Sequence, residues 1–304
     1  MARSETREQL LLIDANSLLH RAFHALPPFK TPDGKPSGAL YGLASILIRV
    51  LRERPFRYVA AAFDRPEPTF REKEYSAYKA TRKPTVNELI SQLIEAPNLF
   101  DSFGIKTFDL AGFEADDIVA TMARKFGGDK IQATILSGDL DTLQVIDGDD
   151  IVVEFPKKGI SETDIYDKDA VVERFGVTPE QLSDYKGLVG DTSDNIPGVS
   201  GIGPKTAANL INKYGTLEEM YKDIEEVGME DEKLLKKLSE NKKQALMSKK
   251  LATLETAVRL DVDIGDIDIT KSFDRKKALA YADKLGSKTL ASRIENDLPE
   301  RYNT

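Results

Sequence analysis

Short apolar runs separated by amphipathic segments fill the first half of the chain. The runs "LLLID" (10–14), "RYVAAAFD" (57–64), "GIKTFDL" (104–110) and "IQATILSGDLD" (131–141) are short and apolar, as buried strands are. Helical patterns lie between them, the first starting near Ser17. Strands that alternate with helices predict an α/β fold with a parallel sheet.

Acidic residues follow each predicted strand. Asp14 and Asp64 end the first two runs, the stretch "GFEADDIVA" (112–120) follows the third, and the fourth ends in two aspartates. Helix capping accounts for one or two acids at a helix start, but not for acids after four strands. Because functional groups gather beyond the carboxyl ends of parallel strands, the pattern favours one shared acidic site.

Two further aspartates come from "VGDTSDNIPG" (189–198), which brings the predicted acidic set to nine. Its members are Asp14, Asp64, Glu114, Asp116, Asp117, Asp139, Asp141, Asp191 and Asp194. So many converging carboxylates ionise together only if cations share the site. Oxygen ligands favour Mg²⁺ or Mn²⁺, and two such ions about 3.5–4 Å apart suit phosphoryl transfer. No EF-hand loop is present, which argues against calcium storage.

Composition excludes several other chemistries. The chain has no cysteine, so disulfides, zinc–thiolate sites and cysteine nucleophiles are ruled out. Its two histidines, His20 and His24, are spaced as in a zinc helix but without the glutamate, and we interpret both as helix-surface residues. The net charge is −8, yet the chain is near neutral once the nine acids are set aside, so local patches matter more than the total.

Neither a signal peptide nor a membrane span is predicted. The N-terminal apolar run ends at Asp14, and the stretch "ALYGLASILI" (39–48) stops at Arg49, well short of a bilayer span. We therefore expect a cytoplasmic protein with no membrane partner.

A basic and aromatic stripe is predicted in residues 65–83. Arg71, Tyr75, Tyr78 and Arg82 recur at helical spacing, with Lys79 beside them. A helix with this face is expected to stand away from the core and to bind a nucleic-acid strand through stacking and phosphate contacts. The alternative is a solvated surface helix with ordinary ion pairs from Glu72 and Glu74.

A glycine-rich turn precedes a predicted helix at 198–215. Gly198, Gly201 and Gly203 permit a tight turn and close backbone approach, and Pro204 suits the first helical position. The amides at this helix start, with Lys205 and Thr206, predict a site for a DNA phosphate. Such a turn contacts the backbone rather than the bases, so it suits duplex DNA of any sequence.

Together these stretches resemble a known family. "DANSLLHRAFHAL", "FDRPEPTFREKEYSAYKATR", "FEADDIVA", "SGDLDTLQV", "DYKGLVGDTSDNIPGVSGIGPKTAANLI" and, more loosely, "LGSKTLASRI" resemble the 5′-nuclease domains of bacterial DNA polymerase I and, more broadly, the flap endonuclease superfamily. The resemblance implies a PIN-like nuclease core in residues 1–180 with a helical arch at about 65–95. It further implies a helix–hairpin–helix-type DNA-binding region with C-terminal helices in residues 181–304.

The resemblance also assigns roles. One metal ion would be bound mainly by Asp14, Asp64, Glu114, Asp116 and Asp117, and the second by Asp139, Asp141, Asp191 and Asp194. Lys79 and Arg82 would contact the scissile phosphate. Tyr78 would stack on a nucleic-acid base, and Arg71 would contact a DNA strand. The carbonyls of residues 198–203 would bind a K⁺ ion. Two positions depart from the family pattern: Leu140 replaces a usual Lys or Arg, and Ala15 a usual glycine.

The expected activity is that of a metal-dependent 5′→3′ exonuclease and flap endonuclease that leaves a 5′-phosphate and a 3′-hydroxyl. Branched, flapped or nicked duplex DNA and RNA-primed DNA would be its substrates in primer removal and repair, with a DNA polymerase as a further partner. Two alternatives stay open: a non-catalytic module that binds DNA junctions, and a PIN-type ribonuclease. The acidic stretch 260–274 is expected to pack back on the core.

Overall fold

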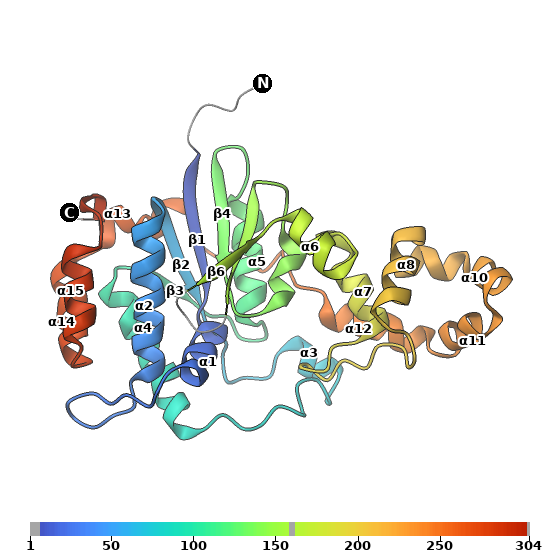
Figure 1. The fold of residues 1–304 in the computed structure, drawn as a ribbon, viewed down its shortest axis with the longest axis horizontal. Coiled ribbons are helices and arrows are strands. Elements are labelled where there is room, and N and C mark those ends of the chain that lie inside the picture. The colour runs from blue at the N-terminus through green and yellow to red at the C-terminus, as the bar shows by residue number, and fades with distance from the viewer. Residues whose placement is uncertain (1–6, 158–161, 303–304) are drawn as a thin grey trace.

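The computed structural model describes residues 7–157 and 162–302, without the side chains of residues 228–230. The central element of these residues is a six-stranded sheet (Figure 1). Its strand order is β3-β2-β1-β4-β5-β6. All neighbouring strands are parallel except β5 and β6. The strands are β1 (Glu8–Asp14), β2 (Phe56–Ala62), β3 (Lys106–Phe108), β4 (Ile131–Leu136), β5 (Ile151–Pro156) and β6 (Thr163–Tyr166). The predicted parallel α/β sheet is thus confirmed, with β3 shorter than predicted and β5 and β6 not predicted.

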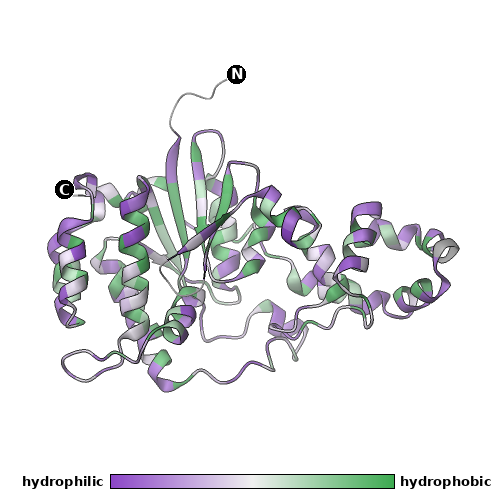
Figure 2. Cartoon of the chain, viewed as in Figure 1, coloured by the Kyte–Doolittle hydropathy of each residue, from purple (hydrophilic) through white to green (hydrophobic). Residues whose placement is uncertain are grey.

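Side-chain alternation along β1 divides the core into two layers. Leu10 and Leu12 pack with α5 on one face of the sheet, and Leu11 and Ile13 pack with α1, α2 and α4 on the other. Both faces of the central strands are therefore apolar. Much of the length of these strands is coloured green, for hydrophobic residues, in Figure 2. The helices concerned are α1 (Ala15–Ala25), α2 (Gly38–Glu53), α4 (Asn87–Ser102) and α5 (Ala115–Phe126).

A group of helices extends away from the sheet (Figure 1). We call residues 182–252 the helical arm. It comprises α7 (Leu182–Val189), α8 (Pro204–Tyr214), α9 (Leu217–Lys222), α10 (Ile224–Glu230), α11 (Glu232–Glu240) and α12 (Lys242–Ala252). The 3-10 helix η1 (Leu140–Val145) connects β4 to β5, and α6 (Lys168–Phe175) and the 3-10 helix η2 (Pro179–Gln181) connect β6 to the arm.

After the arm the chain returns to the sheet. Asp268 forms a bridge with Tyr58 of β2, and the Tyr302 hydroxyl donates to the carbonyl of Phe56 at 2.9 Å. The expectation that residues 260–274 pack on the core is confirmed. The returning elements are η3 (Ile264–Ile267), α13 (Ile269–Ser272), α14 (Arg275–Lys284), α15 (Lys288–Asn296) and η4 (Glu300–Tyr302). None of the helices in the described part of the chain is long and apolar enough to cross a bilayer.

The arch segment, which we define as residues 63–86 between β2 and α4, differs from the prediction. Its only regular helix is α3 (Phe70–Glu74); the chain then turns at Tyr75 and adopts a left-handed conformation at Lys79, with φ of 54°. Arg71 and Tyr78 are buried. The prediction of one exposed helix standing away from the core is therefore wrong. The physical reason is that the cationic side chains of this segment pair with carboxylates of the core and of the helical arm.

Candidate active site

The first two acids of the site follow directly from strand ends. Asp14, the last residue of β1, caps α1 by accepting from the Ser17 amide at 3.2 Å and also accepts from the Ser137 hydroxyl at 2.7 Å. Asp64 follows β2, and its carboxylate accepts from the amide of Ala115 at 2.7 Å. Because β1 and β2 are parallel neighbours, both carboxylates lie at the same edge of the sheet.

The first turn of α5 brings three more acids to this edge. Glu114 is the N-cap residue, and its amide donates to Asp117 at 3.1 Å. Asp116 accepts from the amide of Asp117 at 2.7 Å. Helix capping is therefore part of the explanation for "EADD", because these carboxylates satisfy amides that have no partner within the helix.

Five of the nine predicted acids line one cavity of about 270 Å³, which the arch segment also borders. The side chains of Lys79, Arg82 and His20 line it as well. The five acids are Asp14, Asp64, Glu114, Asp116 and Asp139. The other four, Asp117, Asp141, Asp191 and Asp194, lie around it and are each paired with a cation.

The cavity carries more negative charge than its neighbours neutralise. Burial raises the pKa of Asp14 to about 6, and repulsion from Asp64 adds to the effect. Burial, with repulsion from Glu114 and Asp117, raises the pKa of Asp116 well above its ordinary value. Burial also raises the pKa of Asp139, although Lys186 opposes this. Such a set is stabilised when a cation enters and lets the acids ionise.

Two cations of the arch segment reach the acids from the opposite side. The Lys79 ammonium lies 2.8 Å from Glu114 and 3.8 Å from Asp194. Arg82 pairs with Asp194 and donates to the carbonyl of Ser193 at 3.3 Å. The backbone supports this placement, because the Lys79 amide donates to the carbonyl of Asp194 at 2.8 Å. Two of the predicted site cations thus do meet the predicted acids.

Lys186 is a site residue to which the sequence analysis gave no role. From α7 of the helical arm, its ammonium contacts Asp141 and lies 2.7 Å from Asp191. This contact is the main reason, against the effect of burial, why the pKa of Asp191 falls to about 2. The available signal was its position in "DYKGLVGDTSDN", five residues before Asp191. Lys186 also supplies positive charge near Leu140, where the resemblance leads one to expect a basic residue.

Several predicted DNA contacts lie elsewhere. Arg71 is 1% exposed and pairs with Asp117, which is itself fully buried, so neither is open to the cavity or to solvent. Tyr78 is buried, and its hydroxyl donates to Glu114 at 3.1 Å and to Asp194 at 3.0 Å. Tyr75 packs beside it in a small apolar cluster. These residues are part of the interior because the arch segment folds against the arm.

The two histidines also differ from one another. His24 is exposed, as expected, whereas His20 is half-buried and lines the cavity. Burial lowers the pKa of His20, and the charges of His24 and Arg82 lower it further. The interpretation of His20 as a surface residue is therefore wrong, because α1 starts directly after Asp14 and its second turn lies beside the acids.

The glycine-rich turn is partly buried. Gly198 is buried, and a Cβ atom there would lie 2.3 Å from the Gly190 amide nitrogen, so its role is close packing within the arm. Its carbonyl accepts from Gln244 at 2.6 Å, and that of Gly201 accepts from Lys237 at 3.4 Å. Gly201, Gly203 and Lys205 are exposed and Thr206 is half-buried, so the open part of the predicted phosphate site is the start of α8.

A divalent ion fits the chemistry of this donor set. In the described residues, no three acidic or histidine side chains form a ready-made metal site. Instead, Lys79, Arg82 and Lys186 pair with acids from the set. The cavity acids nevertheless offer only oxygen donors, and the pKa values of Asp14, Asp116 and Asp139 are raised, which is the environment that hard cations such as Mg²⁺ neutralise.

Two family models together match residues 9–275. The 5′-3′ exonuclease N-terminal resolvase-like domain matches residues 9–176, and the 5′-3′ exonuclease C-terminal SAM fold matches residues 177–275. DNA polymerase I of Bacillus subtilis (strain 168) is 39% identical over 294 residues, covering 97% of this chain and 33% of the polymerase. DNA polymerase I of Streptococcus pneumoniae serotype 4 is 37% identical over 292 residues, which cover 95% of this chain and 33% of the polymerase. The chain thus spans about a third of the length of these curated relatives.

Solved structures share the fold. The T5 D15 protein co-crystallised with metal ions has a TM-score of 0.65 at 19% identity and covers 97% of this chain and 100% of its own. Flap endonuclease-1 from Methanococcus jannaschii has a TM-score of 0.60 at 16% identity, and the match covers 98% of this chain and 92% of the endonuclease. Both cover the sheet and the helical arm, so the two parts occur together in proteins of distant sequence.

We expect Lys186→Met to lower thermal stability in metal-free buffer by several degrees, because Asp141 and Asp191 then face each other without a cation. Added Mg²⁺ should restore more stability to this variant than to the unmodified protein. Thermal melts with and without Mg²⁺ measure both effects, and Lys277→Met, at an exposed position of α14, is the control. Equal melting temperatures for the two variants would show that Lys186 does not balance these acids.

Proposed function

Because the chain belongs to the 5′-3′ exonuclease family, we propose that it is a divalent-metal-dependent 5′→3′ exonuclease and flap endonuclease. It hydrolyses phosphodiester bonds near junctions of single-stranded and duplex DNA and leaves a 5′-phosphate and a 3′-hydroxyl. One observation carries the proposal: five carboxylates and two arch cations face each other across a single cavity. This is the charge arrangement that phosphoryl transfer requires, with metal ligands on one side and phosphate-binding cations on the other.

The acids divide into two groups that would hold the metal ions. Asp14, Asp64, Glu114 and Asp116 lie around the α5 start and form the first group. The second group lies between the core and the helical arm and consists of Asp139, Asp141, Asp191 and Asp194. Bound Mg²⁺ or Mn²⁺ supplies water activation and stabilises the leaving oxygen. Asp117 is left out of the first group because both of its oxygens face Arg71.

Lys79 and Arg82 bind the scissile phosphate from the arch side. Lys79 lines the cavity while its ammonium contacts Glu114, so a phosphate oxygen that enters the cavity meets the same ammonium. Arg82 has a half-exposed side chain beside Asp194 and can turn its free donors to a second phosphate oxygen. Both cations then stabilise the charge that develops on the phosphate during transfer.

The exposed start of α8 binds the duplex part of the substrate. A Cβ atom added at Gly203 would meet no atom within 4 Å, so a DNA backbone can approach this position closely. Lys205 is exposed beside it. A K⁺ ion bound by turn carbonyls would have to displace Lys237 from Gly201. Flapped, nicked and RNA-primed DNA are the proposed substrates, in primer removal and repair in the cytoplasm with a DNA polymerase as partner.

The decisive experiment is incubation with a labelled 5′-flap duplex with and without Mg²⁺. Asp116→Ala should abolish cleavage and leave flap binding in Ca²⁺ largely intact, because it removes a cavity carboxylate and none of the proposed DNA contacts. Asp101→Ala, at an exposed position of α4, is the control. Binding without any metal-dependent cleavage would favour a non-catalytic junction module, and preference for RNA flaps over DNA flaps would favour a ribonuclease.

Lys79→Ala should lower the single-turnover rate by about 10²–10³-fold and change flap affinity only a few-fold, since Lys79 acts on charge that appears in the transition state. Rate at saturating DNA and equilibrium binding are measured on one flap substrate. Lys83→Ala, at an exposed position of the same segment, serves as control. A collapse of affinity with an unchanged saturated rate would make Lys79 only a phosphate anchor.

Gly203→Val should weaken duplex binding at least several-fold without loss of fold, because the added side chain occupies open space that the DNA backbone needs. Gly265→Val provides the matched control, since a Cβ atom there also meets nothing within 4 Å. Fluorescence anisotropy with a blunt duplex measures the effect. Equal duplex affinity of the two variants would restrict this turn to a structural role.

A further inference from the structure

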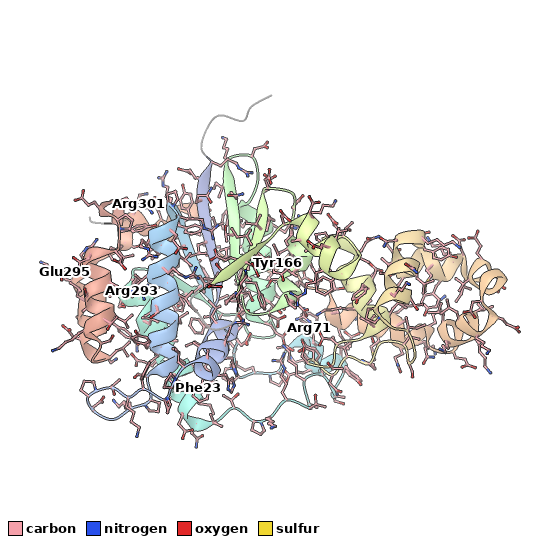
Figure 3. All side chains as sticks on the ribbon, in the orientation of Figure 1. Phe23, Arg71, Tyr166, Arg293, Glu295 and Arg301 are labelled. Atoms are coloured by element: carbon pink, nitrogen blue, oxygen red, sulfur yellow. The ribbon has the colours of Figure 1, made fainter. Side chains whose placement is uncertain are left out.

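The guanidinium group of Arg71 makes all its hydrogen bonds inside the protein. Figure 3 labels it beside α3, between the sheet and the helical arm. Its Nε donates to the carbonyl of Leu251 at 2.9 Å. Nη1 donates to Asp117 at 2.8 Å and to Glu114 at 3.4 Å, and Nη2 donates to Asp117 at 2.7 Å and to the carbonyl of Thr253 at 2.8 Å. Five acceptors thus match the five donors of a guanidinium group, which leaves none for DNA.

Asp117, the partner of Arg71, makes hydrogen bonds of its own to the start of α5 and to Glu255. One of its oxygens accepts from the Glu255 amide at 2.8 Å, and the other accepts from the Glu114 amide at 3.1 Å. With the bidentate contact to Arg71, this ties together α3, the start of α5 and residues 251–255. The last of these segments begins in the final turn of α12 and continues past it, so the pair joins the end of the helical arm to the start of the helix that carries the cavity acids.

The pair also fixes how Glu114 is oriented. One carboxylate oxygen of Glu114 is 3.4 Å from Arg71 and 3.1 Å from the Tyr78 hydroxyl, while the other faces Lys79 at 2.8 Å. Asp116 is in the same helical turn and lines the cavity. A rotation of this turn would move both cavity acids, and the Arg71–Asp117 contact opposes that rotation.

We propose that Arg71 and Asp117 form a positioning pair that aligns Glu114 and Asp116 for metal binding and links their alignment to the helical arm. This inference rests on the proposed metal-dependent nuclease function. The family resemblance implies that Arg71 contacts a DNA strand and that Asp117 is a metal ligand. The positioning role differs from both. Neither residue touches substrate or metal; both act through the residues they hold.

The test removes both charges together, because deleting one partner would leave an unpaired buried charge. In Arg71→Met/Asp117→Asn the asparagine oxygen still accepts from a backbone amide, which favours folding. Arg71→Lys is measured alongside, since it keeps the charge but has too few donor directions to reach all the acceptors. The matched control is Arg124→Met/Asp147→Asn, which removes an exposed pair with a 2.6 Å contact.

Three quantities are compared: Mn²⁺ binding by calorimetry without DNA, flap affinity in Ca²⁺, and single-turnover cleavage at saturating flap DNA. We expect Mn²⁺ affinity to fall about 10–100-fold in the double variant and less in Arg71→Lys. Flap affinity should stay within a few-fold, the cleavage rate should fall in parallel with metal occupancy, and the control pair should change nothing.

Two results would overturn the proposal. Loss of flap affinity with unchanged Mn²⁺ binding would make Arg71 a DNA contact after all. Unchanged values for all three quantities in a folded double variant, or in Arg71→Lys where the double variant does not fold, would make the pair purely structural. If the unmodified protein binds Mn²⁺ but does not cleave flaps, the proposed function fails, while weakened Mn²⁺ binding in the variants still supports the positioning role.

Discussion

Like charges that converge at a buried sheet edge are the constraint on which this structure depends. Nine acids collect around the carboxyl ends of β1, β2 and β4, where burial raises the pKa of Asp14, Asp116 and Asp139. The protein offsets this with four cations, Arg71, Lys79, Arg82 and Lys186, each from a segment outside the parallel strands. The negative charge that these cations leave uncompensated lies in one cavity. A divalent ion is suited to neutralise this remaining charge.

The same ion pairs hold the parts of the molecule together. Lys186 extends from the helical arm to Asp141 of the core, whereas Arg82 extends from the arch segment to Asp194 of the arm. The arm and the arch segment thus each supply a cation to an acid of another part. A site built in this way depends on the relative position of sheet, arch and arm, and a substrate that contacts the arm and the arch can influence the acids through them.

The arch segment shows how the acids decide local structure. Its sequence has the spacing of a cationic, aromatic helix, and an isolated helix would leave that face in water. In the structure, α3 ends at Glu74, Lys79 adopts a left-handed conformation and Tyr78 is buried against Glu114 and Asp194. Ion pairs and hydrogen bonds to the acids are available only in this folded-back form, and they outweigh the local preference for a continuous helix.

The sequence by itself determined four of the six strands, the parallel arrangement and the meeting of Asp14, Asp64 and Asp116, because strand alternation and the acids after each of these strands are local signals. It also contained the family motifs. Only the tertiary structure decided which polar residues are open and which are interior. Arg71 and Asp117 are sealed into a pair and His20 reaches the cavity, because their partners come from segments far away in the chain. Side-chain type and spacing do not encode such long-range pairings, since they arise only when the arm, the arch and the sheet pack together.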